Sequence, residues 1–230
     1  MVAPATDHVA HARGQGARRL AIWVCLVGLP LAYELSGALP GVERFYEGDK
    51  AYWFAGLDVR LVLLMIGVGV VAFAMRQSGM GLAAVGWPAR LRAWHVVVGV
   101  LLLAGTVLFA LQHPGTVSPA QAVSGSTPVT LGERVAFVGL AIAEAIGQEM
   151  IWRGALIRWL EPSVGTFGAA LLAAASYVFY HPGFGMKWQT LRVLVPLTVT
   201  YTILVLWRKN LVPSVLLHFI VTAGQLTVPI

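Results

Sequence analysis

Seven apolar segments dominate the sequence, and their lengths limit the folds that the chain can adopt. They cover residues 20–35, 57–75, 94–111, 135–160, 164–180, 191–207 and 211–228. A helix needs about 20 mostly apolar residues to cross the hydrocarbon core of a bilayer. With 58% hydrophobic and only 11% charged residues, the chain is also unlike an ordinary water-soluble domain. These features predict an all-α integral membrane protein, a polytopic bundle of about seven transmembrane helices.

The lysine and arginine residues indicate how such a bundle would be oriented. Most of them would lie on one side of the membrane, and cytoplasmic loops are enriched in these residues. We therefore predict a multi-pass protein of the cell membrane, with residues 1–19 as a cytoplasmic N-terminal tail. Residues 20–132 would hold the N-terminal transmembrane helices and linkers, and residues 133–230 a core with most of the polar groups. A signal peptide cleaved near Ser36 is the alternative for the first segment, which the further spans disfavour.

The net charge of +6 suggests a negatively charged partner. The basic residues stand beside apolar segments and are not interleaved with aromatic residues, as they would be in a nucleic-acid-binding surface. We therefore expect membrane lipids with anionic headgroups as partners, and no nucleic acid. The single cysteine, Cys25, excludes an intramolecular disulfide.

Ionisable groups inside an apolar segment are costly in lipid and usually mark a functional site or an internal pairing. In this chain they gather in the fourth, fifth and seventh segments. The candidate site residues are Glu144, Gln148, Glu149, Arg153, His181, His218 and Thr222. Glu149 and Arg153 are four residues apart in the order that favours an ion pair, whereas Glu144 and Gln148 form a second row. The alternative to a shared site is a structural role, in which Glu149 and Arg153 neutralise each other and each histidine only donates a hydrogen bond to another helix.

Three short motifs in these segments resemble those of a known family. They are Gln148-Glu149-x-x-x-Arg153-Gly154, the aromatic Tyr177 before His181, and His218-x-x-x-Thr222. The CPBP family of intramembrane proteases, which includes type II CAAX-processing endopeptidases and bacterial abortive-infection proteins, has Glu-Glu-x-x-x-Arg, Phe-x-x-x-His and His-x-x-x-Asn. The resemblance covers roughly residues 133–228 and implies that residues 133–230 are a CPBP-like catalytic core. It also implies a glutamate-type endopeptidase without a cofactor, acting on a membrane-associated peptide or protein tail.

Two positions depart from the family pattern, and they affect the expected mechanism. Gln148 replaces the glutamate that the family is taken to use to activate water, and an amide cannot accept the proton of water at neutral pH. Thr222 replaces an asparagine but can still donate a hydrogen bond. Glu144 or Glu149 would then be the base, and Glu149 would be the poorer one if Arg153 pairs with it.

The resemblance also implies roles for the remaining candidates. Gln148 and His181 would hold the water, and His218 with Thr222 would stabilise the oxyanion. At about 1.5 Å per residue, Glu149 would lie about 18 Å from the turn near residue 161, and His218 about 12 Å from Asn210. Glu144 and His181, at about 26 and 27 Å, would be level with each other. These depths predict a polar column that opens away from the cytoplasm.

Other functions fit parts of the pattern. Glu149, His181 and His218 are the residue types of a two-histidine, one-carboxylate zinc site, although the sequence has no His-Glu-x-x-His motif. Gln148 favours another alternative, a catalytically inactive CPBP-like membrane scaffold or tail-binding chaperone. A transporter is disfavoured, because the polar residues form one cluster and no paired broken helices mark two repeats.

Overall fold

The computed structural model describes residues 5–36, 50–88, 131–181 and 188–225, with a few positions between 92 and 104. Within these residues the secondary structure is helical, and no strand occurs among them. The third predicted segment, residues 94–111, lies almost wholly outside the described residues. The fold therefore agrees with the predicted all-α class, while the predicted number of seven spans remains a prediction.

The helices follow the apolar segments closely, although their ends differ. The elements are α1 (Ala5–Trp23), η1 (Val24–Gly28), α2 (Leu29–Ser36), α3 (Lys50–Gln77), η3 (Leu82–Val85), α6 (Leu131–Gln148), η4 (Glu149–Leu156), α7 (Ile157–Tyr180), α8 (Trp188–Arg208) and α9 (Val212–Gln225). Helix α1 begins well before the first apolar segment, so residues 5–19 of the predicted tail are helical. This part of the chain is rich in alanine and arginine, which are strong helix formers in water as well as in lipid.

Helix α7 contains a sharp reversal at Gly165. This residue has φ 74° and ψ 167°, which glycine adopts readily because it lacks a Cβ atom. The Nε1 atom of Trp152 donates a hydrogen bond of 3.0 Å to Oγ of Ser176, 24 residues later in the chain. In a straight helix these residues would be about 36 Å apart. The chain therefore folds back on itself, as expected from the two separate apolar segments at residues 135–160 and 164–180.

Two stretches among the described residues are long and apolar enough to cross a membrane. They are Gly14–Ser36 and Ala141–Tyr180, and the second one contains the reversal at Gly165. Shorter apolar helices cover Leu61–Gln77, Leu194–Arg208 and Val212–Thr222. Large apolar side chains also point outward on several helices: Leu20, Trp23, Leu31, Met65, Phe73, Phe167, Leu171, Ile203 and Trp207 are exposed. An apolar exterior on this scale is typical of a bundle that is solvated by lipid.

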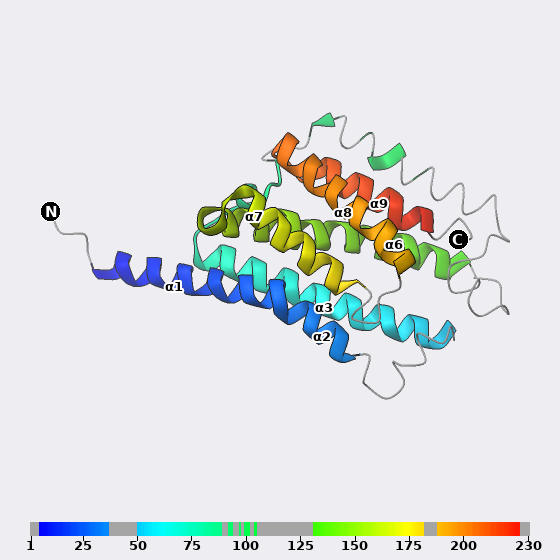
Figure 1. Cartoon of the computed structure of the whole chain (residues 1–230), viewed down its shortest axis with the longest axis horizontal. Coiled ribbons are helices and arrows are strands. Elements are labelled where there is room, and N and C mark those ends of the chain that lie inside the picture. Colours follow the sequence, from blue (N-terminus) through cyan, green and yellow to red (C-terminus); the bar gives the residue numbers. More distant parts are fainter. Residues whose placement is uncertain are drawn as a thin grey trace.

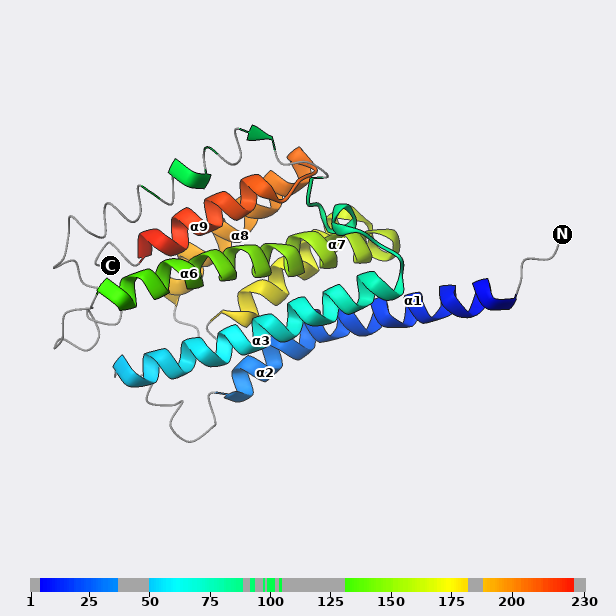
Figure 2. The ribbon, with the colours of Figure 1, turned by 180° about the vertical axis from the view of Figure 1, so that it is seen from behind.

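The helices pack side by side along one common direction (Figures 1 and 2). Helices α1 and α2 lie along α3, and α6 lies between α3 and α9. The part of α7 that follows Gly165 packs on α2 and α8, and α8 forms a hairpin with α9. This arrangement brings the π-helix η4 into contact with α3, α7 and α8, so that a segment at the centre of the bundle carries Glu149 and Arg153.

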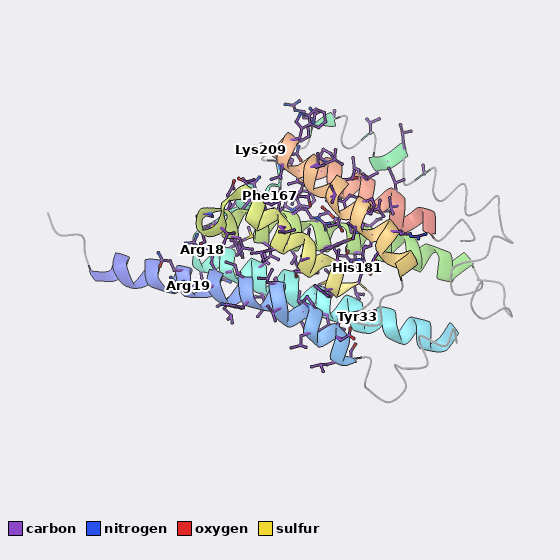
Figure 3. All side chains as sticks on the ribbon, viewed as in Figure 1. Arg18, Arg19, Tyr33, Phe167, His181 and Lys209 are labelled. Carbon is purple, nitrogen blue, oxygen red and sulfur yellow. The ribbon has the colours of Figure 1, made fainter. Side chains whose placement is uncertain are left out.

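Three turns meet at one end of the bundle. The backbone N–H of Leu211 donates to the carbonyl oxygen of Gly86 at 3.0 Å, and Nη2 of Arg158 donates to the carbonyl oxygen of Lys209 at 3.3 Å. Figure 3 places Arg18, Arg19 and Lys209 toward this end and His181 toward the other. We call the first one the basic end, defined by Arg18, Arg19, Arg158, Arg208 and Lys209.

Candidate functional site

The π-helix η4 holds the first candidate residues in the interior of the bundle. All of its residues, from Glu149 to Leu156, are buried. A π-helix has hydrogen bonds from residue i to i+5, is rare, and frequently occurs at functional sites. Gly154 lies against η3, where an added Cβ atom would overlap the carbonyl oxygen of Val85 and reach Cδ1 of Leu211 at 3.2 Å. The absence of a side chain at Gly154 therefore allows η4 to approach both η3 and the turn before α9 closely.

The carboxylate of Glu149 is the centre of the site. Its Oε1 atom lies 3.2 Å from Nη1 of Arg153 and accepts a hydrogen bond of 2.8 Å from Nδ1 of His218. Its Oε2 atom accepts a hydrogen bond of 2.5 Å from Oγ of Ser214. Glu149 is 0% exposed, so these contacts replace the water that a carboxylate would otherwise bind. The ion pair predicted between Glu149 and Arg153 is confirmed.

Two tyrosines enclose the partners of Glu149. The guanidinium carbon of Arg153 lies 3.8 Å from the ring centroid of Tyr177 and 5.3 Å from that of Tyr201. The His218 ring stacks on Tyr201 at 4.9 Å, with an interplanar angle of 13°. Such contacts between a guanidinium and aromatic faces stabilise the cation where water is excluded.

The hydrogen bonds of His218 indicate which of its ring nitrogens carries a proton. A carboxylate only accepts hydrogen bonds, so Nδ1 of His218 carries the hydrogen that lies toward Glu149. The Nε2 atom lies 3.4 Å from the hydroxyl of Tyr177, which donates to Nε2 when the imidazole is neutral. Glu149 therefore orients the His218 ring.

His181 joins this cluster through Tyr177. Its Nδ1 atom donates a hydrogen bond of 2.9 Å to the carbonyl oxygen of Tyr177, one helical turn earlier, and the two rings are 4.2 Å apart. Because a carbonyl oxygen only accepts, the neutral imidazole carries its lone pair on Nε2. His181 is half-buried and lies one turn farther from the basic end than Tyr177.

The site has two layers along the bundle axis. The inner layer consists of six residues in mutual contact: Glu149, Arg153, Tyr177, Tyr201, Ser214 and His218. By their positions along the helices, Glu144, Gln148, His181 and Thr222 lie farther from the basic end, and we call them the outer layer. Glu144 and Gln148 are buried and Thr222 is half-buried. Oε1 of Gln148 has no hydrogen-bond partner among the residues that the structure describes.

The predicted depth of His218 is wrong. Counting from the turns placed it about 6 Å nearer the basic end than Glu149, whereas the two side chains are hydrogen-bonded. The reason is that the turn between the fourth and fifth segments extends beyond the turn between α8 and α9. Arg158 is hydrogen-bonded to Lys209, so these two residues lie at the same level of the bundle. The number of residues from Arg158 back to Glu149 equals the number from Lys209 forward to His218. Counted from this contact, Glu149 and His218 are therefore level with each other.

Sequence reasoning missed two residues of the inner layer, Ser214 and Tyr201. Ser214 precedes His218 by four residues and therefore shares its helical face, a signal that could have found it. The only sequence signal for Tyr201 was its hydroxyl group inside an apolar segment, which does not indicate a site residue. In the described part of the chain, no three His, Cys, Asp or Glu side chains converge as metal ligands. Glu149, His181 and His218 thus do not form the zinc-ligand set considered above.

Residues 130–224 match the family model described as type II CAAX prenyl endopeptidase Rce1-like. The C-terminal region is therefore similar to the Rce1-like family. All seven candidate residues lie within the match, and the resemblance to the CPBP proteases is confirmed over this region. Rce1-like proteins are membrane-embedded, and the family suggests protease activity. Comparisons with curated proteins and with solved structures gave no match.

Proposed function

We propose that the protein is an intramembrane endopeptidase that cleaves a membrane-associated peptide or protein tail. The observation that carries this proposal is the contact of Glu149, Arg153, Tyr177 and His218, which come from three separate parts of an Rce1-like domain. A structural clip would need only the ion pair. The additional histidines, and a second layer of polar groups next to them, are costly in lipid and are explained by a hydrolytic site.

The inner layer positions groups for the reaction and is a poor source of a base. Both oxygens of Glu149 already accept hydrogen bonds, and Arg153 neutralises its charge. Removing a proton from water would require Glu149 to lose such partners. Glu149 therefore serves mainly to orient the His218 ring, much as a buried carboxylate does in hydrolases with a histidine.

The outer layer would carry out the hydrolysis. Glu144 accepts a proton from water, Gln148 and His181 hold that water, and the resulting hydroxide attacks the peptide carbonyl carbon. The negative charge that develops on the carbonyl oxygen is stabilised by His218 together with Thr222. When the C–N bond breaks, Glu144 returns the proton to the leaving amine, so that no proton is left over and no cofactor is needed.

The proposal includes a topology of seven transmembrane helices with the N-terminus in the cytoplasm. It is supported by the basic end, since cytoplasmic loops are enriched in lysine and arginine. With that orientation, the outer layer lies on the side of the site away from the cytoplasm (Figure 3). A substrate tail would then enter from the outer side or from within the membrane.

A randomised decapeptide library tests the proposed activity. The purified protein is reconstituted in liposomes and incubated with the library, and mass spectrometry identifies the fragments. Cleavage by the wild-type protein that is lost in Glu144→Gln and retained in Thr200→Val, a change of an exposed residue on α8, would support the proposal. No fragments from the wild-type protein, at any substrate concentration, would contradict it.

The same experiment detects the alternative function, a membrane scaffold or tail-binding chaperone. Gln148 favours this alternative because an amide cannot act as the base at the position where the family has a glutamate. A wild-type protein that retains library peptides without cleaving them, and that cleaves only after Gln148→Glu, would establish it.

A further inference from the structure

Three threonines on α8 make different use of their hydroxyl groups. Thr200 donates to the carbonyl oxygen of Pro196 at 2.9 Å, and Thr202 donates to that of Thr198 at 2.8 Å. A bond to the carbonyl four residues earlier is the usual way to satisfy a hydroxyl on an apolar helix. Thr198 departs from it: its side chain is 1% exposed, and Oγ1 has no hydrogen-bond partner among the described residues. A buried hydroxyl without a partner is unfavourable, so this group points to a ligand.

Thr198 lies on the face of α8 that lines the site. It precedes Tyr201, whose ring stacks on His218, by three residues, and residues three apart share a helical face. Thr198, Tyr201 and Thr202 are all buried, whereas Val199, Thr200 and Ile203 are exposed. The hydroxyl of Thr198 is therefore directed to the interior of the bundle.

Along the axis of the bundle, Thr198 lies at the same level as the outer layer. Helices α8 and α9 are antiparallel and joined at the basic end, so the residues before Tyr201 and the residues after His218 both lie farther from that end. Thr198 is about 4.5 Å beyond Tyr201, and Thr222 is about 6 Å beyond His218. Gln148, whose Oε1 atom also has no partner in the described part of the chain, precedes Glu149 on the same side. Thr198 thus supplies an unpaired donor and Gln148 an unpaired acceptor at the level of the outer layer, in addition to the two terminal nitrogens of Arg153, which also have no hydrogen-bond partner among the described residues.

We propose that Thr198 and Gln148 bind the main chain of the substrate. The Thr198 hydroxyl donates to a backbone carbonyl oxygen, and Oε1 of Gln148 accepts a hydrogen bond from a backbone N–H. A peptide group offers this combination, and its recognition does not depend on side chains. The inference rests on the proposed function, since it names the substrate groups bound at the same site.

Thermal unfolding of the ligand-free protein in detergent is the first test. Thr198→Val removes a hydroxyl that has no partner among the described residues and keeps the shape of the side chain, so the melting temperature is expected to stay equal or rise. Thr202→Val is the matched control, because it removes a hydroxyl that is hydrogen-bonded on the same buried face. A melting temperature lowered by Thr198→Val as much as by Thr202→Val would overturn the proposal.

Binding of a fluorescein-labelled randomised decapeptide library, followed by fluorescence anisotropy, is the second test. Thr198→Val is expected to weaken binding roughly three- to tenfold, which corresponds to one lost hydrogen bond. Thr198→Ser keeps the hydroxyl and should bind like the wild-type protein, as should Thr200→Val. Unchanged binding by Thr198→Val, or no binding by the wild-type protein, would overturn the proposal.

A library with N-methylated peptide groups tests the Gln148 contact, because it lacks the backbone N–H donors. It should bind the wild-type protein more weakly than the unmodified library, and the difference should disappear in Gln148→Leu. A difference that persists in Gln148→Leu would contradict the assignment. These measurements do not require cleavage, so peptides that bind through Thr198 and are never cut would refute the proposed hydrolysis and leave the inference intact.

Discussion

Nδ1 of His218 donates a hydrogen bond of 2.8 Å to Oε1 of Glu149, and the two residues are 69 positions apart in the chain. The bond joins the π-helix η4 to α9 and places an imidazole beside a buried ion pair. Ser214, one turn before His218, donates to the other oxygen of the same carboxylate. The site thus depends on the packing of α9 against η4 and α6, and the same contacts contribute to the stability of the bundle.

Glu149→Gln is expected to destabilise the protein. It removes the negative charge that compensates Arg153, which is 1% exposed, and a buried charge without a partner costs about 3–5 kcal/mol. The free energy of unfolding in detergent would measure this loss. Glu161→Gln is the control, because Glu161 is exposed and accepts a hydrogen bond from the hydroxyl of Thr166. A Glu149→Gln protein as stable as the wild type but without cleavage would identify Glu149 as the base.

Glu144→Gln is expected to abolish cleavage and leave the fold intact. The amide keeps the size and hydrogen-bonding capacity of the side chain but cannot accept a proton. Gln148→Glu, which restores the family pattern one turn farther along α6, should raise the rate of cleavage. Fragment release measured by mass spectrometry, together with the melting temperature, distinguishes a lost base from a lost fold. Full activity of Glu144→Gln would exclude Glu144 as the base.

The local features of the site could be predicted from the sequence, because helical periodicity determines which nearby residues share a face. The Glu149–Arg153 pair follows from their spacing of four residues. The π-helix that carries this pair could not be predicted in the same way. Its hydrogen bonds span one residue more than those of an α-helix, and tertiary packing, such as the close contact of Gly154 with Val85, determines where it forms.

Contacts between distant segments were harder to predict, because they depend on how far each turn extends. The level of His218 relative to Glu149 was wrong for this reason, and the Arg158–Lys209 hydrogen bond corrects it. Tyr201 was missed because a tyrosine in an apolar segment resembles an ordinary lipid-facing or interfacial aromatic residue. Its role became visible only when the ring was found stacked on His218.

Gly154→Ala is expected to destabilise the bundle by about 1–3 kcal/mol, the usual cost of overpacking. The new methyl group would overlap the carbonyl oxygen of Val85, which belongs to the backbone of η3 and cannot rotate away. Gly139→Ala is the matched control on α6, because no atom of the described residues lies within 4 Å of its added Cβ atom. Alanine is the better helix former there, so Gly139→Ala should stabilise the protein by up to about 1 kcal/mol. Equal unfolding free energies of the two variants would contradict the close packing of η4 on η3.

The last prediction concerns orientation in the membrane. Single cysteines at Gln77, Ser163 and Arg208, all exposed near the turns of the basic end, should react with a membrane-impermeant maleimide only in inside-out vesicles. A cysteine at Arg192, exposed near the start of α8 at the opposite end, should react only in right-side-out vesicles. Lysine and arginine at the basic end are the physical reason, because positively charged loops remain in the cytoplasm during insertion. The natural Cys25 is buried and provides an unreactive background. If the Gln77 and Arg208 variants were labelled from opposite sides of the membrane, these turns would not share one end of the bundle. If all three variants were labelled only from outside, the topology would be inverted and the outer layer of the site would face the cytoplasm.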